Sequence, residues 1–216
     1  MLNINIRMAK NTKEIYDKLK KAYPNVKCAL IHKNAWQLLV ATILSAQCTD
    51  VRVNKVTKEL FAKYPKVEDF SSLPLEKLKK YIYSTGFYNN KAKNIKTAAE
   101  KIIKEFQGKV PDNMQDLLTI PGVARKTANV ILSVWFRKNE GIVVDTHVLR
   151  LAKRLGLTKE SDPKKVEQDL LKLYPQAQWE RIATMLIFHG REVCFAKKPN
   201  CEGCFLNKVC PNAFKV

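Results

Sequence analysis

Four cysteines near the end of the chain have the spacing of metal ligands: Cys194, Cys201, Cys204 and Cys210. The pattern C-x6-C-x2-C-x5-C gathers four thiols within 17 residues, which favours a metal centre. The gaps are uneven and the paired C-x2-C knuckles of a zinc ribbon are absent, so a [4Fe–4S] cluster is favoured, with zinc as the alternative. Disulfides are less suitable, because Cys28 and Cys48 stand singly in apolar surroundings and no apolar signal segment is present.

A tight turn followed by two basic residues lies in the segment 118–128, LTIPGVARKTA. Pro121-Gly122 is typical of a short hairpin between two helices. The unpaired backbone N–H groups at the start of the second helix would form a site for a phosphate group. A plain helical hairpin with a capping glycine is the alternative for Pro-Gly alone, but Arg125 and Lys126 directly after the turn favour the phosphate site.

Lys126 also has the chemistry of a nucleophile. In the first turn of a helix and beside Arg125, its ammonium form is disfavoured by the helix dipole and by a like charge. The neutral amine that results is the group needed to attack an electrophilic carbon and remain bound as a Schiff base. If Lys126 stood alone, it would be interpreted as one more lysine that neutralises phosphate.

Asp145, in the segment Val144-Asp145-Thr146-His147, is first of all a candidate N-cap of the helix that follows. A capping carboxylate stays ionised and points in a fixed direction, so it can also stabilise a positively charged transition state. A helix over residues 124–136 rises about 18 Å, and the extended chain from Arg137 to Asp145 spans up to about 27 Å. The chain can therefore bring Asp145 back to Lys126.

The charge balance points to a polyanionic partner. The chain carries 39 Lys and Arg against 20 Asp and Glu, a net charge of +19 spread over its whole length. The alternative is a lysine-rich solvated surface. No segment approaches the roughly 20 apolar residues of a membrane span, so we expect no membrane partner.

The apolar pattern that must position these residues is helical almost throughout, with Asn34 and Asp50 as candidate N-caps. The segment Gly141–Val144 looks extended but is too short to found a sheet. We therefore predict an all-α fold. The expected helices follow Asn34 and then cover residues 50–64, 74–83, 90–106, 113–119, 124–136, 146–155, 163–173 and 178–190.

Taken in order, the motifs from about Asn34 to Cys210 resemble those of the helix-hairpin-helix DNA glycosylases, and most closely those of the endonuclease III family. The resemblance implies two α-helical domains that flank a DNA-binding groove. A six-helix barrel of residues 28–139 would carry the hairpin, and residues 1–27 plus 140–216 would form the domain that holds a [4Fe–4S] cluster. In this family Lys126 matches the nucleophile and Asp145 the catalytic carboxylate.

The resemblance also implies a set of DNA-binding residues in the hairpin: Gly122, Ala124, Arg125 and Thr127. The family usually has glycine where this chain has Ala124, whose methyl group could loosen the approach of the phosphate. Lys197 and Lys198, between cluster ligands, match a basic loop that could touch phosphates. His147 is expected to be a structural or phosphate-side residue rather than an acid–base catalyst.

Two loops resemble those that enter the opened duplex. Gln47 in the segment SAQCTD matches the glutamine that fills the gap left when a nucleotide is rotated out, although a polar helix terminus is the plainer interpretation. Phe87 in the segment GFYNNKA matches the residue that wedges the opposite strand, where we would expect leucine. An exposed phenylalanine suits stacking in an opened base step, whereas a core anchor is the alternative.

The resemblance implies a bifunctional DNA glycosylase and abasic-site lyase that acts on oxidised pyrimidines in double-stranded DNA. We expect a monomer in the cytoplasm of a prokaryote, associated with the nucleoid. Adenine-specific or mismatch-specific monofunctional glycosylases are the nearest alternative, but these usually lack a nucleophilic lysine at the position of Lys126. A non-catalytic iron–sulfur DNA-binding or redox-sensing module is a further alternative that would not need Lys126 and Asp145 together.

Overall fold

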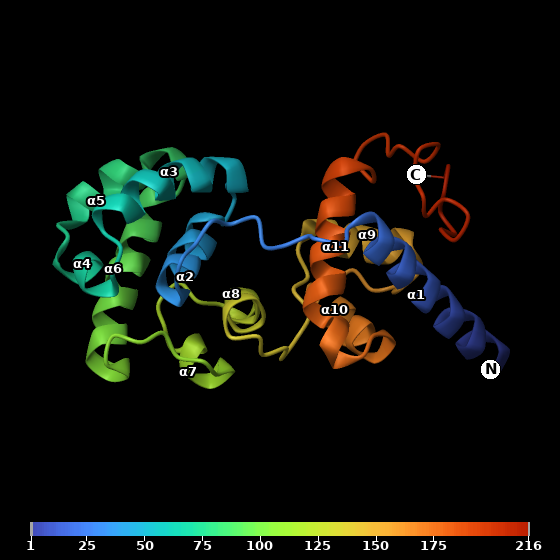
Figure 1. Cartoon of the computed structure of the whole chain (residues 1–216), viewed down its shortest axis with the longest axis horizontal. Coiled ribbons are helices and arrows are strands. Elements are labelled where there is room, and N and C mark those ends of the chain that lie inside the picture. The colour runs from blue at the N-terminus through green and yellow to red at the C-terminus, as the bar shows by residue number, and fades with distance from the viewer. Residues whose placement is uncertain (1, 216) are drawn as a thin grey trace. The chain divides into compact units, whose positions relative to one another are not determined.

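The computed structural model describes residues 2–215 of the chain, and the surroundings of side chains from residue 11 onward. Over residues 2–215 the regular structure is helical with no strand, so the all-α prediction is confirmed (Figure 1). The chain divides into two compact units, one of Cys28–Lys138 and one of Met1–Lys27 with Asn139–Val216. Each unit has its own apolar core.

The unit of Cys28–Lys138 is built around its longest helix, α6, which packs against α4 and α5 (Figure 1). Ala92, Ile95 and Ile102 lie on the apolar face of α6 and are fully buried. The elements of this unit are α2 (Ala35–Leu44), α3 (Asp50–Lys63), α4 (Val67–Ser72), α5 (Leu75–Ile82), the 3-10 helix η1 (Tyr83–Thr85), α6 (Tyr88–Phe106), α7 (Met114–Leu118), α8 (Arg125–Val130) and the π-helical segment η2 (Ile131–Trp135).

Two of the predicted helix starts have different outcomes. Asn34 is confirmed as the N-cap of α2, because its side chain accepts a hydrogen bond from the backbone N of Gln37 at 2.8 Å. The assignment of Asp50 as the next N-cap is wrong by one residue. The cap of α3 is Thr49, whose Oγ1 accepts from Arg52 N at 3.3 Å, and Asp50 is the first helical residue, where its charge faces the positive end of the helix.

The helix predicted over residues 124–136 changes its winding halfway. It begins as α8 and continues as η2, where Phe136 N donates to the carbonyl of Ile131, five residues earlier, at 3.3 Å. Ser133 Oγ donates to Asn129 O at 2.7 Å and so competes for a carbonyl of the regular ladder. A wider turn follows at this point.

The second unit is assembled on α11, which packs against α9 and α1 (Figure 1). Its helices are α1 (Leu2–Ala22), α9 (Thr146–Arg154), α10 (Pro163–Leu173), the 3-10 helix η3 (Gln176–Gln178) and α11 (Trp179–Glu192). The fully buried residues Leu151, Val166 and Leu186 come from three of these helices. Across residues 2–215, none of the helices combines the length and the apolar character needed to cross a bilayer.

Candidate functional site

The turn at Gly122 joins α7 to α8. Gly122 has a φ of +81°, and a β-carbon there would lie 3.0 Å from Cβ of Asn94, so close packing as well as backbone conformation favours glycine. Val123 N donates to Ile120 O at 3.0 Å and closes the turn. Ala124 is the extended N-cap of α8 and has no polar side-chain atom to cap the N–H groups that follow. The start of α8 therefore has no side-chain cap that would compete with a bound anion.

Lys126 lies in the first turn of α8 and is exposed, as is its neighbour Arg125. Thr127 is half-buried, and the next two residues, Ala128 and Asn129, are buried in the core of the unit. The hairpin therefore holds the backbone of Lys126 firmly while its amine remains accessible to a substrate.

The two predicted insertion residues share an unusual backbone conformation. Gln47 has a φ of 53° and Phe87 a φ of 47°, in the left-handed region that non-glycine residues seldom occupy. Gln47 is exposed in the turn after α2. Phe87, the N-cap of α6, is 64% exposed, which rules out the alternative that it is a core anchor.

Asp145 is the N-cap of α9, as predicted, and its Oδ1 accepts a hydrogen bond from Val148 N at 2.8 Å. His147 is the second residue of α9 and is half-buried, and its Nδ1 lies 3.2 Å from Nη2 of Arg150. Burial is the main cause that lowers the pKa of His147, while the Asp145 carboxylate raises it and Arg150 and Arg191 lower it. The lowered pKa favours the neutral form of His147, while its role as a structural or a phosphate-side residue stays a prediction.

Two arginines attach α9 to the cysteine segment. Arg150 Nη2 donates to the carbonyl oxygens of Gly190 and Cys194, both at 2.9 Å. Arg154 Nη1 donates to Cys194 Sγ at 3.3 Å and to Phe195 O at 2.6 Å. No sequence motif pointed to either arginine. Their spacing of four residues, which puts them on one face of a helix, was the available signal.

The basic loop between the cysteines is fixed at its base. Arg154 Nη2 donates to Ala196 O at 3.0 Å, directly before Lys197. Asn200 N donates to the carbonyl of Val193 at 3.0 Å and closes the loop on its other side. Lys197 and Lys198 between these contacts are exposed, so the loop presents both ammonium groups to solvent.

All four predicted cysteine ligands line one cavity: Cys194, Cys201, Cys204 and Cys210. His189 Nε2 lies 3.4 Å from Cys204 Sγ, and burial raises the pKa of the Cys204 and Cys210 thiols. In the part of the chain that the structure describes, no three cysteine, histidine or acidic side chains are arranged as ligands of a single metal ion. Four thiols around one cavity, with Arg154 as a donor to one sulfur, are a donor set that fits an iron–sulfur centre.

Lys126 and Asp145 belong to different units, the first to Cys28–Lys138 and the second to Asn139–Val216. The structure gives the surroundings of each residue within its own unit. The predicted approach of Asp145 to Lys126 therefore stays a prediction. Within single units, the structure gathers the four cysteines around one cavity. It also places Lys91, to which no sequence motif pointed, in contact with the two helix ends from which the loops of Gln47 and Phe87 begin.

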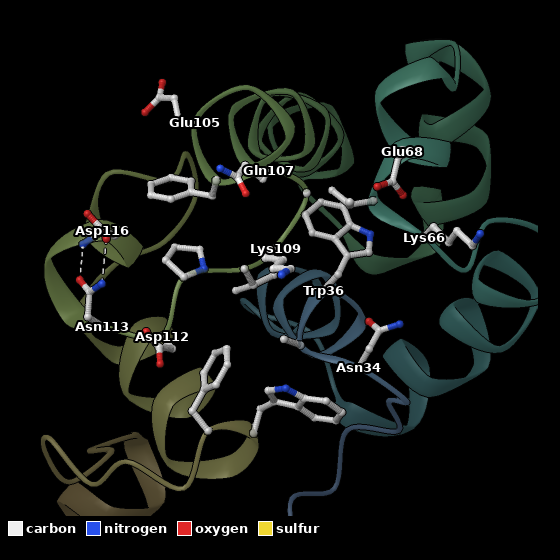
Figure 2. Close-up of a pocket in the computed structure, with 18 residues that line it drawn as sticks. Asn34, Trp36, Lys66, Glu68, Glu105, Gln107, Lys109, Asp112, Asn113 and Asp116 are labelled. Atoms are coloured by element: carbon white, nitrogen blue, oxygen red, sulfur yellow. Dashed lines mark hydrogen bonds between the residues drawn. The ribbon is translucent and has the colours of Figure 1, made fainter.

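A large groove in the unit of Cys28–Lys138, with a volume of about 760 Å³, is lined by Trp36, Lys109 and several acidic residues (Figure 2). None of the predicted site residues lines it. Two of its carboxylates already have partners, because Asp112 binds Lys138 at 2.6 Å and Asp116 binds Asn113 at 2.7 Å. We therefore do not assign the candidate site to this groove.

Comparisons with known proteins agree with the motifs. The model of the family described as HhH-GPD superfamily base excision DNA repair protein matches residues 40–176. Endonuclease III of Synechocystis sp. (strain ATCC 27184 / PCC 6803 / Kazusa) is 54% identical over 195 residues, which cover 90% of this chain and 89% of the relative. Endonuclease III of Bacillus subtilis (strain 168) is 46% identical over 195 residues, with the same shares of both chains covered.

Solved structures of endonuclease III are also similar to this chain. A non-covalent endonuclease III–DNA complex matches with a TM-score of 0.90 and 41% identity over 95% of this chain and 96% of that one. A trapped endonuclease III–DNA covalent intermediate matches with a TM-score of 0.90 and 42% identity over the same shares. A thermostable thymine-DNA glycosylase, with a TM-score of 0.83 and 23% identity, shares the fold. The chain therefore belongs to the HhH-GPD superfamily of base excision DNA repair proteins and, within it, to the endonuclease III family.

Proposed function

We propose that this chain is a bifunctional DNA glycosylase and abasic-site lyase that excises oxidised pyrimidines from double-stranded DNA. The observation that carries the proposal is the exposed Lys126 in the first turn after the hairpin of an endonuclease III family member. One similar protein was captured as a covalent intermediate with DNA. A reactive amine at position 126 would account for such a species in this chain.

The reaction that we assign to Lys126 has four steps. The amine lone pair forms a bond to C1′ of the damaged nucleotide while the glycosidic C1′–N bond breaks, and the base leaves with that electron pair and takes up a proton. The sugar ring then opens to a Schiff base between Lys126 and C1′. Loss of a proton from C2′ expels the 3′ phosphate by β-elimination, and water releases the lysine.

Asp145 is proposed to stabilise the positive charge that develops on the sugar when the base leaves. Its Oδ1 accepts the hydrogen bond from Val148 N, so the carboxylate is held in a fixed direction and has no need to reorient during the reaction. This role requires that the two compact units form the two domains on either side of the DNA groove, which we propose for Cys28–Lys138 and for Met1–Lys27 with Asn139–Val216.

The DNA contacts are divided by type. The backbone N–H groups at the start of α8 and the side chains of Arg125, Lys197 and Lys198 are proposed to bind phosphates, which positions the duplex without reading its sequence. Ala124 and Thr127 are proposed to belong to the same DNA-binding surface of the hairpin.

Gln47 is proposed to fill the gap left by the extruded nucleotide, and Phe87 to enter the opposite strand, since both lie in exposed turns.

The four cysteines are proposed to hold a [4Fe–4S] cluster, whose bonds would close the loop that carries Lys197 and Lys198 and fix its shape. The cluster would supply structure rather than electron transfer, because the proposed reaction involves no net oxidation or reduction. Since the similar endonuclease III proteins of Synechocystis sp. and Bacillus subtilis are bacterial, the proposed place of action is the cytoplasm of a prokaryote, at the nucleoid.

The proposal is tested by incubating the protein with a duplex that contains one oxidised thymine, in the presence of borohydride. We expect a covalent protein–DNA adduct, because reduction of the Schiff base makes it permanent, and mass spectrometry of the digested adduct should locate the sugar on Lys126. A duplex with an undamaged thymine is the control. Base release without any adduct would instead identify a monofunctional glycosylase, and DNA binding without base release a non-catalytic module.

A further inference from the structure

Lys91 is a lysine in a position that would suit an apolar residue. It lies on the same face of α6 as Ile95, Ala98 and Ile102, which are fully buried, and it is itself only 4% exposed. Its Nζ donates two hydrogen bonds, to Leu44 O and to Thr85 O, both at 2.8 Å. One buried ammonium group thus joins two segments that are 41 residues apart in the chain.

Both acceptors are carbonyl groups at the ends of helices. Leu44 is the last residue of α2 and Thr85 is the last residue of η1. The final carbonyls of a helix have no partner within it and carry partial negative charge, so they are favourable ligands for a cation. Lys91 therefore caps the C-terminal ends of both helices.

The segments that begin at these two points are the proposed insertion loops. Gln47 follows Leu44 by three residues, and Phe87 follows Thr85 by two. Both residues have left-handed backbone conformations, which persist only where the surrounding structure determines them. The ammonium of Lys91 contacts the last helical residue before each of the two loops.

A simple role in packing does not explain the charge of Lys91. Burial lowers the pKa of its ammonium group, which expresses the cost of removing that group from water, and the nearby thiol of Cys48 acts in the opposite direction. Methionine has a similar length and would fill the same space without that cost. What methionine would lack is the ability to hold two carbonyl groups at a set separation.

We propose that Lys91 is a positioning residue that couples the loops of Gln47 and Phe87, so that both side chains enter the opened duplex at a fixed separation and as one unit. The inference rests on the insertion roles proposed above for these two residues. Because Lys91 is buried, the proposal assigns it no contact with substrate or with the reacting atoms.

The test compares Lys91→Met with a matched control, Lys96→Met. Lys96 lies on the same helix, and its Nζ also donates to two carbonyl groups, Ser71 O at 2.8 Å and Leu73 O at 3.2 Å, at the end of α4. The control loses the same kind of contact at a point from which no insertion loop begins. Lys91→Arg, which keeps a cation with several donors, serves as the rescue variant.

Single-turnover excision from a damaged duplex is measured for Gln47→Ala, Phe87→Ala and the pair, in the wild-type, Lys91→Met, Lys91→Arg and Lys96→Met backgrounds. We expect Lys91→Met alone to lower the maximal single-turnover rate of excision about tenfold without changing the protein concentration that gives half of that rate, and to leave adduct formation on a single-stranded abasic site unchanged. In the wild-type, Lys91→Arg and Lys96→Met backgrounds, the paired change should cost at least about fivefold less than the product of the single changes. In Lys91→Met the effects should simply multiply.

Persistence of the non-additive effect in Lys91→Met would overturn the inference. If Gln47→Ala and Phe87→Ala both excise normally, the proposed insertion roles fail, and hydrogen exchange of the free protein decides whether Lys91 still couples the loops. Lys91→Met should then speed amide exchange in both loops while Lys96→Met speeds it in neither, and equal exchange in the two variants would also overturn the inference. Lys91→Gln, which is shorter and uncharged, replaces Lys91→Met in all of these measurements if the latter does not fold.

Discussion

The two units hold their proposed reactive groups in opposite ways. In the unit of Cys28–Lys138, Lys126 is an exposed side chain at the start of α8. In the other unit, the Asp145 carboxylate is half-buried and accepts a hydrogen bond from the backbone of its own helix. The difference follows from the chemistry that each group would perform. A nucleophile must travel to a carbon atom, whereas an electrostatic stabiliser works best when its position is already fixed.

The largest loss of activity is expected when the exposed amine of Lys126 is removed. Lys126→Gln keeps length and polarity but loses the amine, so DNA should bind normally while base release and borohydride trapping fall to background, a loss of at least about a thousandfold. Trapping yield and single-turnover excision measure this. Lys104→Gln, which removes another exposed lysine of the same unit, is the matched control and should leave both unchanged. A normal adduct from Lys126→Gln would mean that another amine is the nucleophile.

Removal of the Asp145 carboxylate should slow the reaction less, and by an amount that depends on the substrate. Asp145→Asn keeps a side-chain oxygen for the Val148 cap but loses the charge, so we expect normal folding and about a hundredfold slower base excision. On a pre-formed abasic site no base has to leave and the aldehyde is already electrophilic, so adduct formation should change much less. Equal losses on both substrates would contradict the assigned role.

The cysteine cavity should matter for shape rather than for chemistry. Cys201→Ser removes one of the four thiols, so the purified variant should lose iron and sulfide, unfold at a lower temperature and bind DNA about tenfold more weakly. Metal analysis, thermal melting and a binding titration check these outcomes. Cys28→Ser, which lies outside the cavity, should retain its iron. Stoichiometric zinc in the wild-type protein would contradict the cluster assignment.

The basic loop should contribute less, and without regard to sequence. The double variant Lys197→Gln, Lys198→Gln should reduce the slope of log affinity against log salt by up to about two, since each phosphate contact adds about one. Excision from bound DNA should be unchanged. The adjacent exposed lysines Lys164 and Lys165 of α10 offer a control pair with the same change of net charge. An equal slope change in that pair would show that net charge, rather than the loop, attracts the DNA.

The sequence predicted the helices well where a cap or a breaker residue marks their ends. Asn34 and Asp145 are caps as expected, and the error at Asp50 was one residue, because Thr49 offers an equally suitable acceptor. The winding change at Ile131 was missed, since a serine that bonds to the preceding turn leaves no clear trace in the apolar pattern.

The supporting residues were harder to predict than the reactive ones. Lys126, Asp145 and the cysteines stand in recognisable motifs, whereas Arg154 and Lys91 act through backbone carbonyl groups 41 and 47 residues away. Such acceptors exist at every position of a chain, so sequence gives no preference among them. The available signal for Lys91 was a lysine on the apolar face of α6.

The smallest expected effect is a change in the pKa of His147 when the charge of Asp145 is removed. Burial lowers the pKa of His147 and the Asp145 carboxylate partly offsets this, so Asp145→Asn should lower that pKa further. Because the folded-state pKa lies below the unfolded one, the unfolded state gains the proton first, and stability contributed by neutral His147 is lost as pH falls below the ordinary histidine range.

Titration of the His147 ring by NMR, assigned with His147→Gln, measures this pKa in the wild type and in Asp145→Asn. Urea unfolding at several pH values between about 5 and 7, a range that contains the ordinary histidine pKa, should show a steeper acid-induced loss of stability in Asp145→Asn. Removal of a positive neighbour by Arg191→Gln should shift the His147 pKa in the opposite direction. An unchanged or raised His147 pKa in Asp145→Asn would mean that the carboxylate does not stabilise the protonated imidazole. The electrostatic role of Asp145 would then lose its local support, and the contrast between a fixed carboxylate and a mobile amine would rest on the helix cap alone.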